Sequence, residues 1–303
     1  MAIPVYATPL ERAWRYAYRA ICALIFFFLI APIVTIIPLS FNAEPYFTFT
    51  ERMLRLDPEG FSLRWYDALL TMGMAAPDAP RDAAWWADVW ANADWVNAAK
   101  NSLIIGFFST LLATVLGTVA ALGLARPEMP FRRAIMAVLI SPMIVPIIIT
   151  ATGLFFFYSA TGLANSYVGI ILAHATLGIP FVIITVTATL VGFDQSLNRA
   201  ALSLGASPTT TFFKITMPLI LPGVISGALF AFVTSFDEVV VVLFVAAHDQ
   251  QTIPRQMWNG IREQISPAIL AVATILVVIS VALLTVLEAL RRRSERLRGL
   301  SPG

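Results

Sequence analysis

Two adjacent acids, Asp237 and Glu238, interrupt an otherwise apolar stretch of the chain. A charge at the centre of a bilayer costs roughly 2.5–3.5 kcal/mol on insertion scales, so such residues usually face a cavity or a partner. Neighbours on a helix point about 100° apart, so the two carboxylates cannot face one cavity equally. We expect at least one carboxylate to line a path for a cationic solute. The alternative is a structural pair bonded to another helix or to a partner chain.

Further side chains are candidates for the same path. Thr234 and Ser235 lie one turn before Glu238 and could hydrogen-bond to its carboxylate. His174 lies among apolar residues, either as a buried structural histidine or as a contact for the solute. Trp258 lies in the polar segment that follows the acids and is a candidate for a gate at that end of the path.

The residue sets of common enzymes are missing from the sequence. It contains no G-x-x-x-x-G-K-[ST] phosphate loop, no His-Glu-x-x-His pair, and only two histidines. Its one cysteine, Cys22, excludes an internal disulfide and a cysteine-based metal cage. We therefore predict no catalytic residue, no metal site and no cofactor in this chain.

The composition points to a membrane protein. Of the 303 residues, 58% are hydrophobic and 13% are charged, whereas a soluble protein has about 25% charged residues. This excludes a soluble enzyme, a nucleic-acid-binding protein and a disordered chain. Because a polytopic membrane protein is one bundle, we treat 1–303 as a single transmembrane domain.

Runs of about 20 apolar residues predict an all-α bundle of six transmembrane helices. The first contains Pro32 and Pro38 and has no clear cleavage site, so it is interpreted as an anchor and not as a signal peptide. Prolines at 142, 146 and 180, and the pair Gly223 and Gly227, together suggest a closely packed bundle that can move. The predicted spans are 21–39, 103–124, 134–158, 168–191, 219–247 and 269–287.

Basic residues are distributed unequally between the two sides of these spans. One side holds 13 of the 20 basic residues and five acids, and the other side holds seven basic residues and 11 acids. The positive-inside rule therefore places both termini in the cytoplasm. The arginines after the last span are expected to anchor it at lipid headgroups; they are Arg291, Arg292, Arg293, Arg296 and Arg298.

The outer loop 40–100 contains five of the seven tryptophans. Within it, residues 82–101 are predicted as one amphipathic helix with Trp86 and Trp90 on one face. This helix either rests at the headgroup level or forms a docking platform for an extracytoplasmic partner, and both can hold.

The cytoplasmic loop 193–218 is longer than the usual connection of 2–8 residues between helices. Its first part, 198–204, has helical periodicity and is interrupted by Gly205. Ser207 and Pro208 then give an N-cap followed by proline at the first helical position. A second short helix is expected over 208–216, ending before Pro218.

This loop resembles the "EAA" loop of ABC importer permeases, through Ala200, Ala201, Gly205, Ile215, Met217 and Pro218. In that family the loop docks into the ATP-binding subunit. Arg199 stands where the family pattern has Glu, so the charge pairing at that contact is not carried over. The resemblance implies that the coupling residues are Arg199, Ala200, Ala201, Gly205, Ala206, Ser207, Pro208 and Pro218.

Four other segments look like the spermidine/putrescine-type permeases, whose relatives also import other amines, amino-acid derivatives and opines; they are 61–66, 101–103, 235–240 and 253–258. The resemblance implies a bacterial inner-membrane complex of this chain, a second homologous permease chain, an ABC ATPase dimer that holds ATP and Mg, and a periplasmic solute-binding protein. A heterodimer of permeases is favoured over a homodimer. The alternative from another class is a channel or a proton-coupled carrier with Asp237 or Glu238 as its proton site.

Overall fold

The computed structural model describes residues 8–126, 128–263 and 266–297, and the side chains of residue 263 and of 286–297 are not described. By contacts, the chain divides into two units, Met1–Met72 with Gly260–Gly303, and Gly73–Asn259. Helices make up both units, and the part of the chain that the structure describes contains only one isolated β-bridge, between Asn42 and Phe61.

The first unit contains α1 (Pro9–Leu39), α2 (Glu51–Leu54), η1 (Pro58–Gly60), α3 (Arg64–Thr71) and α14 (Ala268–Leu297). Both α1 and α3 contact α14. The loop between α1 and α3 folds around Asn42, whose side chain donates to the carbonyls of Tyr46 and Thr48, both at 2.9 Å. The predicted anchoring arginines at 291–296 have no described side chains, and Arg298 lies outside the described residues.

The second unit contains the remaining helices, and the last of them, α13, extends past the unit's final residue, Asn259. They are α4 (Ala83–Asn92), α5 (Asp94–Leu124), α6 (Arg132–Ile140), η2 (Ser141–Met143), α7 (Ile147–Thr161), α8 (Tyr167–Val191), α9 (Ser196–Ser203), α10 (Pro208–Thr211), η3 (Phe212–Thr216), α11 (Met217–Asp237), α12 (Val240–Val245), η4 (His248–Gln250) and α13 (Ile253–Glu263).

Five described helices are long and apolar enough to cross a membrane, and the number is six if one bent pair of helices forms a single span. The all-α prediction and the approximate positions of all six runs are confirmed. The continuous third helix predicted over 134–158 is wrong, because Arg132–Met143 and Ile147–Thr161 meet at 96°. Pro142 and Pro146 lie at this break, where each removes a backbone donor, and Pro146 also disfavours helix at the residue before it.

The fifth predicted span, 219–247, is also not one helix. The helix ends at Asp237, Glu238 has extended backbone with ψ 125°, and α12 begins at Val240. The predicted single helix over 82–101 is likewise wrong, because Ala93 is extended and separates α4 from α5.

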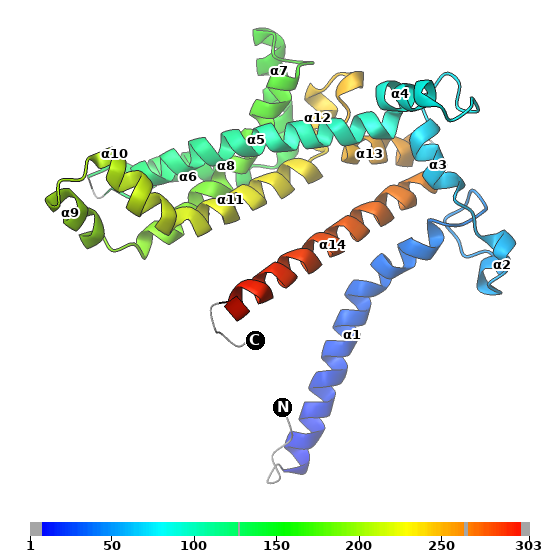
Figure 1. Ribbon diagram of the computed structural model, residues 1–303, viewed down its shortest axis with the longest axis horizontal. Helices are drawn as coiled ribbons and strands as arrows, with labels where there is room; N and C mark the ends of the chain where they lie inside the picture. The colour runs from blue at the N-terminus through cyan, green and yellow to red at the C-terminus, as the bar shows by residue number, and fades with distance from the viewer. Residues whose placement is uncertain (1–7, 127, 264–265, 298–303) are drawn as a thin grey trace. The chain divides into compact units, whose positions relative to one another are not determined.

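Close helix packing holds α5, α8 and α11 side by side (Figure 1). Gly178 of α8 lies against Ala113 of α5 and Ala231 of α11. Gly223 and Gly227 of α11 meet the backbone and side chains of α8, which confirms the predicted close contact of this glycine pair. These small residues allow the backbones of the three helices to approach closely. Close packing is needed in a membrane because the hydrophobic effect does not drive helices together in lipid.

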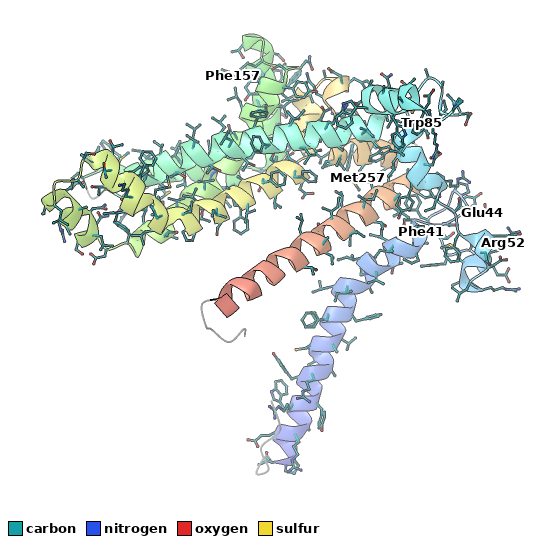
Figure 2. The ribbon with its side chains drawn as sticks, viewed as in Figure 1. Phe41, Glu44, Arg52, Trp85, Phe157 and Met257 are labelled. Carbon is teal, nitrogen blue, oxygen red and sulfur yellow. The ribbon has the colours of Figure 1, made fainter. Side chains whose placement is uncertain are left out.

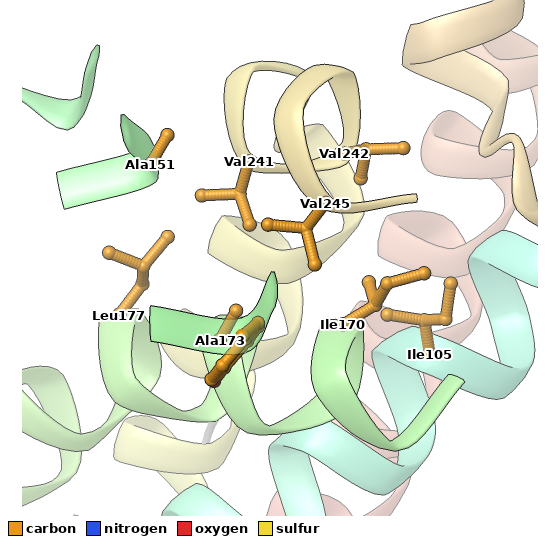
Figure 3. Packing of buried hydrophobic residues seen from close by; sticks show 9 residues of the cluster. Ile105, Ala151, Ile170, Ala173, Leu177, Val241, Val242 and Val245 are labelled. Atoms are coloured by element: carbon orange, nitrogen blue, oxygen red, sulfur yellow. The ribbon is translucent and has the colours of Figure 1, made fainter. Parts of the chain in front are cut away.

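A cluster of buried apolar residues lies beside the bend before α7 and the break between α11 and α12 (Figure 3). It joins α7, α8 and α12 with Ile105 of α5. Its members are all buried; they are Ile105, Ala151, Tyr158, Ile170, Ala173, Leu177, Val241, Val242 and Val245. The short helix α12 therefore packs on the bent arm α7 and on the start of α8.

Candidate substrate path and coupling loop

The two predicted acids lie at the break between α11 and α12, in different environments. Asp237 is the last residue of α11 and is exposed. Glu238 is 8% exposed, and its Oε1 accepts a hydrogen bond of 2.9 Å from the backbone N–H of Val241. Glu238 thus satisfies a donor at the N-terminus of α12, where a negative charge is also favoured by the helix dipole.

The other end of α12 is held by groups from two further segments. Arg255 of α13 donates from Nη1 to the carbonyl of Val242 at 3.0 Å. The N–H of Asn165, before α8, donates to the carbonyl of Val245 at 2.9 Å. Partial burial lowers the pKa of the Arg255 guanidinium from its usual value, but it remains a cation at neutral pH. The short helix therefore has an acid at its N-terminus and a base at its C-terminus.

His174 is 1% exposed and connects the three central helices. Its Nδ1 is 2.8 Å from Ser235 Oγ of α11, and Ser109 Oγ of α5 donates to the same oxygen at 2.9 Å. Ser235 therefore bonds to His174 and Ser109 and not to Glu238, contrary to one expectation from the sequence. Thr234 is half-buried, and among the described residues it has no hydrogen bond to Glu238.

The outer segment that contains Trp258 is attached to the ends of α5 and α8. Asn101 donates to the carbonyls of Asp249 and Gln251, both at 2.9 Å, and accepts from Tyr167 at 2.8 Å. Trp258 itself is 43% exposed on α13. Asn101 and Arg255 lie in segments 101–103 and 253–258, which carried the family resemblance, but neither side chain was assigned a role from the sequence.

The coupling loop begins with α9, which ends in two hydrogen bonds typical of a Schellman motif. The N–H of Ala206 donates to the carbonyl of Ala201 at 3.0 Å, and the N–H of Gly205 donates to that of Leu202 at 3.0 Å. Gly205 has φ +85°, which explains why the helix predicted over 198–204 stops there. At its start, a backbone hydrogen bond from Ser196 lowers the pKa of the Asp194 carboxyl.

Replacing Gly205 with Ala is expected to destabilise this turn by roughly 1–2 kcal/mol, because a Cβ disfavours the left-handed conformation. The matched variant Gly205→Asn is expected to lose less, since Asn tolerates that conformation. Hydrogen exchange of the amides of residues 205 and 206 measures the difference. Equal exchange in both variants would contradict the assigned turn.

The second short helix of the loop is not separate from the next span. Ser207 caps α10, accepting from the N–H of Thr210 at 3.2 Å. A π-helical turn, η3, then carries the chain directly into α11, giving one helix over Pro208–Asp237. The wider turn accommodates Pro218, which has no N–H to donate to the preceding turn. The predicted end of this helix before Pro218 is therefore wrong.

Most of the loop's coupling candidates are exposed. Arg199, Ala200, Gly205, Ser207, Pro208 and Pro218 are exposed, Ala206 is half-buried and Ala201 is buried. Large apolar side chains are exposed among them, and Leu204 is 89% exposed. We call these side chains the loop patch; they are Leu197, Leu202, Leu204 and Phe213. Exposed apolar groups of this size, gathered on one short loop, are typical of a surface that contacts another protein or the membrane.

Sequence comparisons place this arrangement among transport proteins. Residues 113–297 match the family described as binding-protein-dependent transport system inner membrane component. The spermidine/putrescine transport system permease protein PotC of Haemophilus influenzae is 30% identical over 277 residues, covering 91% of this chain and 97% of the relative. The putrescine transport system permease protein PotI of Escherichia coli is 31% identical over 281 residues, covering 90% and 88%.

Solved structures share the fold. A bacterial ABC transporter involved in the import of the acidic polysaccharide alginate has a TM-score of 0.65 at 14% identity, over 95% of this chain and 98% of that one. The MetNI methionine ABC transporter, in an inward-facing conformation, has a TM-score of 0.51 at 20% identity, over 66% and 94%. With a family match over more than half of its length, the chain belongs to the inner-membrane components of binding-protein-dependent transport systems.

Proposed function

We propose that this chain is one of two permease subunits of an ATP-driven importer for polyamines such as putrescine or spermidine. The assignment of a polyamine as the cargo rests on the exposed carboxylate of Asp237. This carboxylate lies at a helix break, in a chain about 30% identical to polyamine permeases. An acid at such a break can attract an ammonium group along the path. A related small amine, an amino-acid derivative or an opine is the alternative cargo.

The two acids have different roles in this proposal. Asp237, which is exposed, meets the cationic solute. Glu238, which is buried and bonded to the N–H of Val241, positions α12. Thr234 and Trp258 remain candidates for the path, since both are partly accessible. His174 is assigned a structural role, because its contacts are with Ser235 and it is 1% exposed.

The partners follow from the loop patch and the family. An ATPase dimer, which holds ATP and Mg, binds the loop 193–218. A second homologous permease chain completes the pathway as a heterodimer, and a periplasmic solute-binding protein delivers the cargo. Supporting this, the structural neighbours are ABC transporters, and large apolar side chains such as Leu204 are exposed on the loop.

The proposed location is the bacterial inner membrane, with both termini in the cytoplasm. The excess of basic residues on one side of the spans supports this orientation. It places the loop patch in the cytoplasm, within reach of an ATPase, and α4 on the opposite side. Arg199, which replaces the family's acid, then presents a positive charge to the ATPase.

The continuous helix Pro208–Asp237 physically connects the coupling loop to the acid at the helix break. Its 30 residues span about 45 Å at 1.5 Å per residue. One end carries Phe213 of the loop patch, and the other end carries Asp237. When ATP closes the ATPase dimer, the loop moves, and the helix transmits that motion to the break beside α12. The path then opens outward to accept cargo, which is alternating access.

Uptake by acid variants tests the cargo assignment. Asp237→Asn is expected to lower polyamine uptake about tenfold, since one lost charge contact of 1.4 kcal/mol corresponds to that factor. The control Asp237→Glu keeps the charge and is expected to retain most uptake. Glu238→Gln is expected to reduce uptake through a weakened α12 cap without changing substrate preference. Full transport with unchanged preference in both neutral variants would refute the path.

A further inference from the structure

We infer that α4 is an interfacial helix whose exposed aromatic face rests in the lipid headgroups of the membrane. This face is distinct from the substrate path and the loop patch. It consists of residues spaced at helical intervals, and all of them are exposed: Ala83, Trp86, Ala87, Trp90 and Ala91. Trp86 is 53% exposed and Trp90 is 64% exposed.

The opposite face of α4 fixes the helix on the protein. Trp85 and Val89 are 3% and 4% exposed. Trp85, labelled in Figure 2, donates from Nε1 to the carbonyl of Pro77 at 3.2 Å. The carboxylate of Asp82 caps the helix by accepting from the N–H of Trp85 at 2.9 Å. Because the inward face is packed and bonded, the outward face is held in a defined orientation.

Contacts with α5 set the depth of α4. Asn97 donates to the carbonyl of Ala91 at 3.0 Å. Lys100 donates to the carbonyl of Trp90, and its Nζ lies 4.7 Å from the centre of the Trp90 ring. The C-terminal end of α4 therefore lies beside the first turns of α5, as Figure 1 also shows.

Large exposed apolar side chains of α5, a candidate membrane span, begin immediately after these contacts. Leu103 is 57% exposed, and Phe107 is 60% exposed. Leu103 is three positions after Lys100, which is about 4.5 Å along a helix. The headgroup layer on each side of a bilayer is roughly 5–7 Å thick. Lys100 therefore lies within the headgroup layer when Leu103 marks the edge of the hydrocarbon, and Trp90 lies against the Lys100 ammonium.

The chemistry of the face fits lipid better than a protein partner. Tryptophan is enriched at the membrane–water interface because its ring is amphipathic. Lysine at the same level can extend its ammonium to headgroup phosphates. The face carries no acid, and Asp88 at its edge is already bonded to Asn92. The helix also contacts α5, which is long and apolar enough to cross a membrane, and this commits the proposal to the bilayer.

Site-directed fluorescence tests this placement in the assembled complex. Cys22 is the only cysteine, so Cys22→Ser provides a background for Trp90→Cys, labelled with bimane. Matched controls are Phe107→Cys, on the exposed side of α5, and Asp78→Cys, in the exposed loop before α4. The complex is reconstituted in vesicles of phosphatidylethanolamine and phosphatidylglycerol that carry a nitroxide on the headgroup or on the acyl chain.

At position 90, headgroup nitroxide is expected to quench strongly, and iodide is expected to quench about threefold less than at position 78. Position 107 should respond to the acyl nitroxide. Iodide quenching equal to that at position 78 overturns the proposal. So does shielding that arises only when the system's solute-binding protein is added, because α4 would then dock that protein. Trp86→Cys repeats the test on the same face, and no outcome depends on which solute is transported.

Discussion

Replacing Leu204 with Asp is expected to abolish ATP-dependent uptake by preventing the ATPase from binding. Leu204 is 89% exposed at the end of α9, so the free energy of unfolding should hardly change. A buried apolar anchor at an interface typically contributes 2 kcal/mol or more, so we expect the affinity for the ATPase to fall about thirtyfold to hundredfold. The amount of ATPase that co-purifies with the permease, together with uptake, measures the effect.

Leu54→Asp provides a control for the same chemical change. Leu54 is 71% exposed on α2, in the outer loop 40–100, on the proposed side away from the ATPase. This variant should retain the co-purified ATPase. Wild-type amounts of ATPase bound to Leu204→Asp would show that the loop patch does not form the coupling surface.

Replacing Gly227 with Leu is expected to prevent α11 from packing on α8. A Cβ at this position would lie 2.7 Å from the Cα of Val182 and 2.5 Å from Thr185 Oγ1. Backbone cannot move away as a flexible side chain can, so the helices must separate. Overpacking of a well-packed core lowers the free energy of unfolding by about 1–3 kcal/mol. Because this variant must displace a backbone, we expect a loss at or above the upper end of that range.

The measurement is the midpoint of thermal aggregation of the detergent-purified protein, followed by size-exclusion chromatography. Gly153→Leu is the matched control, because a Cβ at Gly153 meets no atom within 4 Å. We expect a marked fall in the midpoint for Gly227→Leu and little change for Gly153→Leu. Equal midpoints would contradict the close contact between α8 and α11.

The arrangement of spans was predictable because a long apolar run has one stable structure in lipid, the helix, which satisfies its own backbone. All six runs found from composition correspond to helical segments, and Gly205 was correctly predicted to interrupt the loop. The close approach at Gly227 was also expected from its spacing to Gly223.

The breaks were harder to predict, because composition does not distinguish a straight apolar helix from a bent one. The 96° bend around Pro142 and Pro146 depends on what α7 packs against, which is α12. The break after Asp237 contains no proline or glycine; Glu238 caps a new helix there, and the tertiary core at Val241 holds it. Periodicity alone gave no signal for either contact.

In the candidate site, too, some features could be predicted from the sequence and others could not. The loop residues carried a pattern, so their positions could be assigned from the sequence. The different roles proposed for Asp237 and Glu238 depend on their exposure and on the hydrogen bond to Val241, which the sequence does not reveal. The contacts of Asn101 with Asp249 and Gln251 join segments about 150 positions apart, and no local pattern in one sequence reports such a pairing.

Polyamine uptake by the purified complex in proteoliposomes tests the central claim most directly. The permease is purified with its co-eluting chains, and uptake of putrescine and spermidine is measured with and without ATP and the solute-binding protein. We expect uptake that requires both ATP and the solute-binding protein, with ATP hydrolysis stimulated by the loaded binding protein. Uptake driven by a proton gradient without ATP, by a permease that purifies without an ATPase, would contradict it.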